Sequence, residues 1–432
     1  MRIAFIVEKF PVLSETFILS QITGLIKRGH QVHIYSHYCN DQKKVHEDVH
    51  KFHLLQYTYY SPRFPKDYFR RFIKALGLIL IYFPQAPIKI LSALNVFKYG
   101  KYAASLKLLY SIIPFLKSAP YDIIHAQFGM HGIEGMMYRE IGVLQGKLIT
   151  SFRGYDISWY LKEEGNHVYD QLFVKGDLFF ANCHFFRDRV VRLGCDRYKI
   201  IVHGSGVDPD QFRFRRRYFT NKVCITTVGR LIEKKGIEYG IRAVKQVLDI
   251  YPHVEYKIIG DGYLKEYLQD LIDDLNIASK VKLLGWRNRT EIVDILDRSH
   301  IFIAPSVTAA NGNQDAPVNT LKEAMLMGLP VIGTYHGGIP ELIEDGVSGF
   351  LVPTRDSDAI AQKIIYLIEH PEIWEKIGKN GCSYVKATYD IDKLNDQLVE
   401  IYRQLIEKEL PVSKLISPTL ERTAKNIVRI GK

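Results

Sequence analysis

The sequence has few cysteines and no long apolar run, and each absence excludes a class of protein. Its five cysteines are an odd number with no C-x-x-C pair, so neither a disulfide framework nor a thiolate zinc site is expected, and a reducing compartment fits better. Residues 2–7 open the chain without the charged and apolar regions of a secretory signal. The longest apolar stretch, residues 75–84, is about half of the roughly 20 residues that a membrane-spanning helix needs. We therefore expect a soluble or peripheral protein.

The positive charge of the chain is concentrated in one segment. The chain has 432 residues, 47% of them hydrophobic and 24% charged, which excludes wholesale disorder and predicts two or three domains. Its formal net charge is +11, and residues 51–120 contain eleven Lys and Arg against the single acid Asp67. This segment, which is also rich in Tyr, Phe, Leu and Ile, therefore carries nearly the whole excess.

Short runs of Ile, Val and Phe recur with helix-length segments between them. The expected strands lie at residues 3–7, 123–125, 148–150, 178–180 and 200–202, and then at 223–228, 256–259, 281–284, 301–304 and 331–333. Continuous apolar runs of this kind indicate parallel strands covered by helices on both faces, so an α/β doubly wound fold is predicted. The polar stretch at 208–221 is interpreted as a linker between domains at 1–207 and 222–385, and residues 386–432 as a helix and a basic tail.

Chemistry-bearing residues follow the expected strand 301–304. Asp315 precedes a helix in which Pro317 suits the first position, and Asn319 and Glu323 share a face because they are four residues apart. The first-turn amides of Val318, Asn319 and Thr320 would form an anion site. Glu323 could accept hydrogen bonds from the vicinal hydroxyls of a ribose, and Asp315 from a sugar. Alternatively, Asp315 caps the helix and Glu323 is a solvated surface residue.

A second glycine-rich loop follows, and together these stretches resemble a known family. Residues 304–341 combine P-S, an acid and a Glu eight positions apart, E-A-M, G-x-P-V and G-G-x-P-E. This pattern is similar to the retaining GT-B glycosyltransferases of glycosyltransferase family 4. Residues 10–17 and 306–312 look like the colanic acid and exopolysaccharide branch, and the resemblance spans about residues 1–410. It implies two Rossmann-like domains facing a central cleft, with the acceptor on the N-terminal domain and the nucleotide sugar on the C-terminal one.

The resemblance also implies roles for particular residues. The residues that match Arg230 and Lys235 hold the nucleotide diphosphate in the family, and two cations five apart on a strand-to-helix loop independently suit an oxyanion. Gly260 and Gly262 match the family's I-G-D-G turn. Because the family works without a metal, no metal or other cofactor is expected, and a UDP-sugar is the first choice of donor and a GDP-sugar the second.

The candidate catalytic residues include departures from the family pattern. Asp315, followed by Ala316, stands where Glu-Gly is usual, so one methylene of reach toward the donor sugar is lost. Family members often carry H-x-H after the strand that ends at His125, but here the second position is Gln127, for which His131 could compensate. A histidine at a strand end is often structural, and that alternative stays open for His125 and His131. Arg153 replaces the usual histidine in residues 151–156 and could neutralise a phosphate or an acidic acceptor.

We therefore expect transfer of a sugar, with retention of configuration, to a lipid-linked saccharide in exopolysaccharide or cell-surface glycan synthesis. Two alternatives remain: a sugar-nucleotide epimerase of the same fold, and a degenerate sugar-nucleotide-binding protein without transfer activity. A dinucleotide oxidoreductase is disfavoured, because no G-x-G-x-x-G follows the first strand.

The basic segment 51–120 has three interpretations. It lacks a nucleic-acid-binding motif, so charge is the only support for nucleic acid as a partner, and it has too many aromatic residues and leucines for an ordinary solvated face. We favour a surface that meets an anionic membrane, with apolar groups entering the interface and Lys and Arg meeting lipid heads. The expected location is cytoplasmic, on the inner face of the cell membrane.

Overall fold

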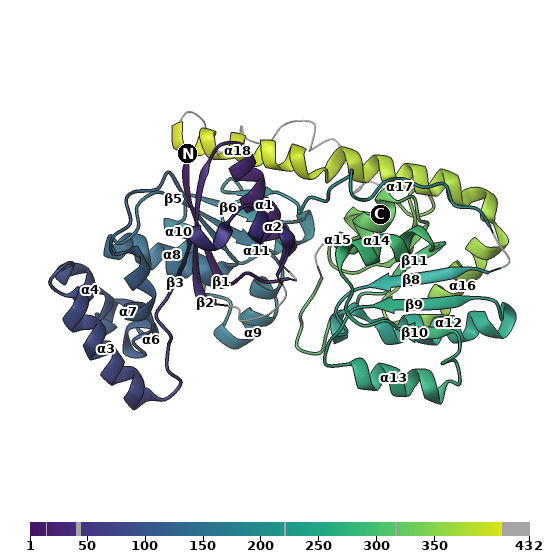
Figure 1. The fold of residues 1–432 in the computed structure, drawn as a ribbon, viewed down its shortest axis with the longest axis horizontal. Coiled ribbons are helices and arrows are strands. Elements are labelled where there is room, and N and C mark those ends of the chain that lie inside the picture. The colour runs from purple at the N-terminus through teal and green to yellow at the C-terminus, as the bar shows by residue number, and fades with distance from the viewer. Residues whose placement is uncertain (14, 40–44, 220–221, 316–317, 408–432) are drawn as a thin grey trace.

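The computed structural model describes residues 1–13, 15–39, 45–219, 222–315 and 318–407. Within these residues the chain forms a seven-stranded and a six-stranded sheet, which lie side by side in two α/β domains (Figure 1). The predicted α/β fold with two doubly wound parallel sheets is confirmed. The basic tail expected beyond the last helix, residues 408–432, lies outside the described residues, as do positions 220–221 of the expected linker.

The first sheet has the order β3-β2-β1-β4-β5-β6-β7, and its strand pairs are parallel. Its strands are β1 (Arg2–Phe10), β2 (Gln31–Cys39), β3 (Thr58–Tyr60), β4 (Ile123–Gln127), β5 (Lys147–Phe152), β6 (Leu178–Ala181) and β7 (Ile200–Val202). The five strands expected from apolar runs are present. The other two, β2 and β3, were not anticipated, because β2 intersperses polar residues with apolar ones and β3 has only three residues.

The second sheet repeats the same arrangement, in the order β10-β9-β8-β11-β12-β13. Its strands are β8 (Cys224–Val228), β9 (Glu255–Ile259), β10 (Val281–Leu283), β11 (Ile301–Ala304), β12 (Val331–Thr334) and β13 (Phe350–Val352). In both sheets the strand order reverses beside the first strand of the domain, between β1 and β4 and between β8 and β11. A ligand of a doubly wound sheet binds outside the carboxyl ends of the strands at this switch point.

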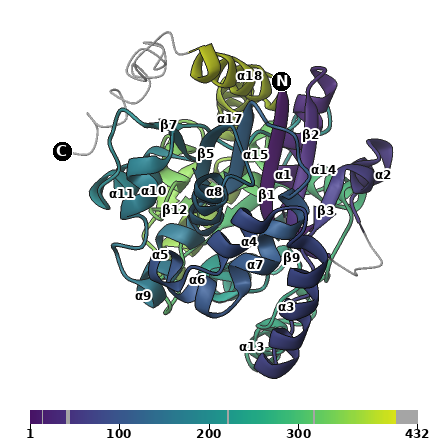
Figure 2. The same ribbon diagram turned by 90° about the vertical axis from the view of Figure 1, so that its left-hand side faces the viewer.

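Helices cover both faces of each sheet, so the strands are buried on both sides (Figures 1 and 2). In the first domain they are α1 (Thr16–Lys27), α2 (Glu47–Lys51), α3 (Tyr68–Tyr82), α4 (Pro87–Ala93), α5 (Val96–Tyr99), α6 (Lys101–Ala104), α7 (Lys107–Ile112), α8 (Gly129–Ile141), α9 (Trp159–Glu164), α10 (Asp170–Lys175) and α11 (His184–Arg192). The rest are α12 (Ile237–Ile250), α13 (Lys265–Asp274), α14 (Arg289–Asp297), α15 (Asn319–Leu326), α16 (Ser357–Glu369), α17 (Trp374–Thr388) and α18 (Ile391–Glu407).

Within the described residues the chain crosses between the domains twice. The first crossing follows β7, where Val207 pairs with Asp390. After α17, which packs on the second domain, α18 returns to the first domain, where Leu398, Val399 and Tyr402 join its core (Figure 1). Helix α18 is therefore a structural part of the first domain.

The basic segment is a helical insertion between β3 and β4. It contains α3 to α7, and α3 and α4 extend from the end of the first domain that faces away from the second domain (Figure 1). None of the helices in the described part of the chain is long and apolar enough to cross a membrane. All five cysteines are free, as expected, and four of them are buried.

Because α18 completes the first core, its apolar face should stabilise that domain. Replacing the fully buried Leu398 with Ala should lower the free energy of unfolding by about 2–5 kcal/mol, through lost burial and a residual cavity. Replacing Gln397, an exposed neighbour on the same helix, with Ala should change the free energy of unfolding by less than about 0.5 kcal/mol. Urea unfolding of both variants measures the difference, and equal effects would contradict this role of α18.

Candidate functional site

The loops at the two switch points hold most of the residues singled out by the sequence. In the second domain these are the loop after β8, which carries Arg230, and the loop after β11, which carries Ser306 and leads to Asp315. In the first domain they are the loop after β1, which carries Glu15, and the carboxyl end of β4, where Gln127 is the last residue. The charge of Arg230 lowers the pKa of Glu15, although burial and Glu8 raise that pKa overall to about 7. Hydrogen bonds between the two domains, described below, place these loops beside the domain boundary.

Asp315 is the centre of a buried polar cluster. Its carboxylate accepts from Lys235 Nζ at 2.8 Å and from Ser306 Oγ at 2.9 Å, and it lies 3.2 Å from Lys234 Nζ. Its backbone amide donates to Nε2 of His336 at 3.1 Å. Burial alone would raise the pKa of Asp315, but the two lysines hold it well below its usual range. The site thus keeps a charged acid and two cations together in a dry environment.

The structure corrects the alternative in which Asp315 caps the following helix. Helix α15 begins at Asn319, and its N-cap position is Val318, so Asp315 lies three residues before the cap. The expected role of Pro317 as the first helical residue, and the departure at Ala316, fall on positions outside the described residues.

Helix α15 carries Asn319 and Glu323 one turn apart, as the spacing predicted. Thr320 Oγ1 donates to the carbonyl of Val228 at 2.9 Å, which fastens the first turn of the helix to the end of β8. On the same helix Glu323 is partly buried rather than solvated, and this burial raises its pKa to about 7, against the opposing charges of Arg289 and Lys322. The neighbouring Lys322 is fully buried; it donates to the carbonyl of Ser205 at 2.7 Å, and burial lowers its pKa to about 7.

Gly260 and Gly262 support the loop that carries Arg230. A Cβ on Gly260 would lie 1.9 Å from the carbonyl oxygen of Gly229, and one on Gly262 would lie 2.4 Å from that of Leu231. The backbone of this turn also bonds to the loop, since Leu231 N donates to Asp261 O at 2.9 Å. The two glycines therefore allow a close approach that holds Arg230 in place, while Arg230 itself is exposed.

Arg153, on the first domain, is held by amide oxygens. Its guanidinium donates to Gln127 Oε1 at 3.0 Å and to Gln21 Oε1 at 3.3 Å, and it lies 4.6 Å from the centre of the Phe17 ring. Burial lowers the pKa of Arg153 to about 10. The two departures from the family pattern, Gln127 and Arg153, thus form one interacting pair.

His125 is fully buried beneath this pair. Nδ1 lies 2.6 Å from the hydroxyl of Tyr402 on α18, and Nε2 lies 2.7 Å from Ser151 Oγ. Burial lowers the pKa of His125 well below its usual range. With both ring nitrogens occupied in the core, this placement favours the structural interpretation of His125.

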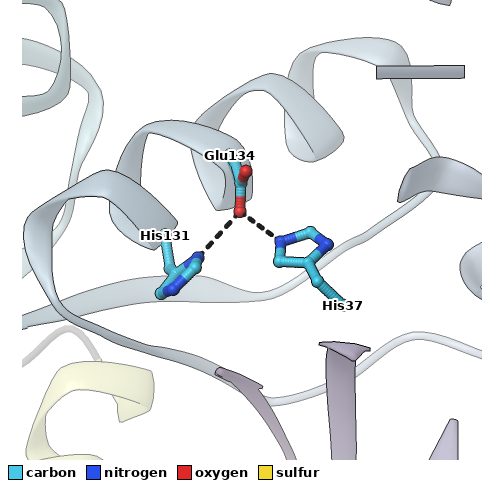
Figure 3. A group of neighbouring side chains, drawn as sticks. All are labelled: His37, His131 and Glu134. Atoms are coloured by element: carbon cyan, nitrogen blue, oxygen red, sulfur yellow. Dashed lines mark hydrogen bonds and ion pairs between the residues drawn. The ribbon is translucent and has the colours of Figure 1, made fainter. Parts of the chain in front are cut away.

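His131 belongs to a second buried cluster in the same domain (Figure 3). Its Nδ1 lies 2.8 Å from Glu134 Oε2, and His37 Nε2 from β2 lies 2.6 Å from the same oxygen. These three groups are close enough to hold a metal ion. Lys107 Nζ, from the helical insertion, lies 2.8 Å from the other carboxylate oxygen.

Direct contacts join the domains beside the switch points. The carboxylate of Glu341, in the second glycine-rich loop, accepts from the backbone amides of His184 and Phe185, each at 2.8 Å. It therefore binds the N-terminal end of α11 in the other domain, where a negative charge is favourable. Arg189, on the same helix, donates to Gln314 Oε1 at 2.7 Å.

Several residues of the site were not anticipated as participants. The fold brings three further side chains to the site. Lys234 and His336 reach the Asp315 cluster, and Lys322 reaches the domain boundary. Glu15 lies in the residues 10–17 that carried the resemblance, but its chemistry was not assigned. Lys234 adjoins a predicted phosphate ligand, which is the one local signal that pointed to it.

The comparisons with known proteins agree with this architecture. A family model described as Glycosyl transferases group 1 matches residues 208–383, and one described as Glycosyltransferase Family 4 matches residues 14–211. The amylovoran biosynthesis glycosyltransferase AmsK of Erwinia amylovora is 36% identical over 374 residues, which cover 85% of this chain and 90% of that protein.

Another relative and a solved structure extend the comparison. WcaL of Escherichia coli K12, named as a candidate colanic acid biosynthesis glycosyltransferase, is 35% identical over 370 residues, covering 84% of this chain and 90% of WcaL. The crystal structure of Anabaena HepE in complex with UDP has the same fold, with a TM-score of 0.70 at 20% identity over 94% of this chain and all of HepE.

The contact of Glu341 with α11 can be tested by removing the carboxylate. Glu341→Ala should lower the free energy of unfolding by about 1–3 kcal/mol, because two backbone donors lose a charged acceptor. The amide protons of His184 and Phe185 should also exchange faster with solvent. Glu344→Ala, an exposed neighbour, is the matched control. Unchanged exchange at both amides in the Glu341 variant would refute the contact.

Proposed function

This chain belongs to the group 1 glycosyltransferases of glycosyltransferase family 4, and we propose that it moves a sugar from a nucleotide-sugar donor to a saccharide acceptor. Like its relatives AmsK and WcaL, it is a glycosyltransferase of exopolysaccharide biosynthesis. The observation that carries the proposal is the convergence of Arg230, Lys235 and the first turn of α15 at one switch point. Such a site suits the diphosphate of a nucleotide donor.

The donor would lie along the loops of the second domain. Its diphosphate would meet Arg230, Lys235 and the amides of Val318, Asn319 and Thr320, while the ribose hydroxyls would donate to Glu323. Lys235 Nζ already lies 2.8 Å from the carboxylate of Asp315, so the diphosphate and Asp315 would both bind this lysine. Asp315 would then face the sugar through a water or a hydroxyl, one methylene shorter than the usual glutamate.

Uridine is the proposed base of the donor, with guanosine second. The Anabaena protein of the same fold binds UDP, and we propose the same base for the donor of this chain. No metal ion is needed in the proposed reaction, because Arg230, Lys235 and the helix amides can themselves neutralise the departing diphosphate.

Retention of configuration is proposed for the transfer step. The acceptor hydroxyl attacks the anomeric carbon from the face on which the diphosphate departs, as the bond to the diphosphate oxygen breaks. The hydroxyl proton passes to that departing oxygen, so the step balances without a second carboxylate to form a covalent intermediate. Arg230 and Lys235 stabilise the charge that gathers on the diphosphate.

A membrane-bound, lipid-linked acceptor is proposed from the surface of the helical insertion. Large apolar side chains are exposed along α3, α4 and α5, among them Leu80 at 78% and Ile88 at 80% exposure. We call this the α3–α5 surface; it comprises Phe69, Phe72, Ile73, Leu76, Leu80, Ile81, Ile88, Leu91, Val96 and Phe97. The exposed basic residues Arg63, Lys66 and Arg70 lie at its start. Apolar residues flanked by basic ones are typical of a surface that enters an anionic membrane.

Glu323 gives the sharpest test of donor binding and transfer. Glu323→Ala should lower kcat/KM at least about 100-fold, because two hydroxyl donors lose a charged acceptor. Since burial raises the pKa of Glu323 to about 7, the carboxyl is largely protonated at pH 6 and ionised at pH 8. Ribose hydroxyls donate to the ionised form, so the affinity for UDP should rise with pH in this range, by up to about tenfold.

Calorimetric titration of UDP and GDP, together with transfer assays, measures both effects. The terminal phosphate of UDP also gains charge in this range, so the UDP affinity of Glu323→Gln should still rise between pH 6 and 8, but less than that of the unchanged protein. Glu15→Gln is the necessary control, because the pKa of Glu15 is also about 7, and this variant should keep the pH dependence. Near-native transfer by Glu323→Ala would refute the assignment, and nucleotide binding without any transfer would favour the degenerate binding protein.

The α3–α5 surface predicts a preference for anionic vesicles. The chain should sediment with vesicles that contain phosphatidylglycerol more than with pure phosphatidylcholine. A triple change of Leu80, Ile88 and Phe97 to Ser should reduce this binding at least about tenfold, while UDP binding remains. Val174→Ser, at an exposed apolar position on α10, is the control. Equal sedimentation with both kinds of vesicle would contradict a membrane surface here. Undiminished sedimentation of the triple variant with anionic vesicles would contradict it as well.

A further inference from the structure

Two histidines and one glutamate of the first domain converge on a single point (Figure 3). His37 lies on β2, whereas His131 and Glu134 lie three residues apart on α8 and therefore share one face of that helix. His37 Nε2 and His131 Nδ1 lie 2.6 and 2.8 Å from the same oxygen, Oε2 of Glu134. The three ligand atoms all lie within 4.8 Å of one another. The fold thus gathers two imidazole nitrogens and a carboxylate oxygen around one place.

The chemistry of these three groups selects the class of metal that they suit. Imidazole nitrogens favour zinc and other first-row transition metals, whereas magnesium and calcium prefer oxygen ligands. Two histidines and one glutamate form a known zinc-binding set that leaves a fourth position open, and zinc binds such ligands more tightly than iron(II) does. The set therefore favours zinc.

The spacing of the ligand atoms is close to that of a zinc site. Bonds from zinc to nitrogen or oxygen are about 2.0–2.2 Å long, so the ligand atoms of a tetrahedral site lie roughly 3.3 Å apart. The two contacts on Oε2 of Glu134 are shorter than this separation by roughly 0.5–0.7 Å. His37 borders a cavity, so its ring has room for the small outward movement that would admit the ion.

Neighbouring groups orient two of the three ligands. Lys107 Nζ lies 2.8 Å from Oε1 of Glu134, which leaves Oε2 to the two histidines. His37 Nδ1 lies 3.5 Å from Ser61 Oγ, an acceptor for the ring proton when Nε2 binds the ion. Partners of this kind, which bind the far side of a ligand, orient the ligands of metal sites and tune their affinity.

The cavity beside the cluster supplies the fourth position. It has a volume of about 520 Å³, and all three ligand residues line it. Its wall contains the carboxylates of Glu8, Glu134 and Glu164 against the ammonium groups of Lys101 and Lys107, so the charge of the wall favours a cation. The side chain of Lys107 is 43% exposed, and solvent therefore screens its repulsion of an ion at the opposite carboxylate oxygen.

We propose that His37, His131 and Glu134 bind one zinc ion, whose fourth ligand is a water molecule from the cavity. The ion would join β2 to α8, and the carboxylate that it binds also holds Lys107, on α7 of the helical insertion. Its role would be to stabilise the first domain and the attachment of the insertion to the sheet. The inference goes beyond the proposed transfer reaction, in which the diphosphate is neutralised without a metal.

The experiment titrates the full chain, freed of metal with a chelator, with zinc chloride in a calorimeter. One equivalent should bind with a Kd below about 1 μM and should raise the urea concentration at the midpoint of unfolding. Cobalt(II) in place of zinc should give the visible absorption bands of a four-coordinate site. His37→Ala and Glu134→Gln should each weaken zinc binding at least about tenfold and lose the cobalt bands.

Two matched variants serve as controls. His33→Ala removes another histidine of β2, whose Nδ1 lies 2.6 Å from the hydroxyl of Tyr121. Glu140→Gln changes another carboxylate of α8, which pairs with Lys98 and Lys175. Both controls should bind zinc like the unchanged chain.

The inference is overturned if no equivalent of zinc binds below about 10 μM. Undiminished zinc binding in either folded variant would also overturn it, and would indicate an adventitious ion at exposed histidines such as His167, whose side chain is 93% exposed. Should the buried Glu134→Gln change prevent folding, His37→Ala, at a side chain that borders the cavity, decides the outcome. UDP titration of the same samples tests the proposed function separately, since zinc binding requires no nucleotide.

Discussion

The carboxyl ends of parallel strands lie at one edge of a sheet, and the chemistry of this protein depends on that constraint. Each domain reverses its strand order beside its first strand, so the loops after β1 and β4, and after β8 and β11, lie next to each other. The loops of the second domain bring Lys235 to Asp315, although 80 residues separate them in sequence. The loops of the first domain bring Arg153 to Gln127. Because α18 and Glu341 bind the domains together, these two sets of residues face each other.

The sequence predicted those parts of the fold and the site that local patterns encode. Continuous apolar runs mark strands such as β4 and β11, and the spacing of Asn319 and Glu323 places them on one face of α15. The sequence did not reveal β2, because its burial alternates with exposed and half-exposed positions. It also could not reveal partners that only the fold brings together, such as His37 and Glu134, which are 97 residues apart.

Burial decides what several of these residues can do, and sequence alone does not give burial. Glu323 and Lys322 are neighbours on α15, and burial shifts both of their pKa values to about 7 from opposite directions. Asp315 is more deeply buried than Glu323, yet its pKa falls because Lys234 and Lys235 are close to it. Desolvation therefore prevails at Glu323 and is overcome at Asp315, because Lys235 and Ser306 donate hydrogen bonds directly to the Asp315 carboxylate. Arg289 and Lys322 act on Glu323 only through their charge.

The same reasoning separates the basic residues of the helical insertion into two kinds. Lys101 and Lys107 pair with Glu164 and Glu134, so an adjacent carboxylate balances each positive charge, although the Lys101 side chain is exposed. Arg63, Lys66 and Arg70 are exposed beside the apolar side chains of the α3–α5 surface. A net charge counted over residues 51–120 merges these two roles. A cation paired with a carboxylate adds little net charge at the surface, so Arg63, Lys66 and Arg70 contribute more to the field there than Lys101 and Lys107 do. The charge excess of the segment therefore divides between exposed cations beside the α3–α5 surface and cations that are paired with carboxylates.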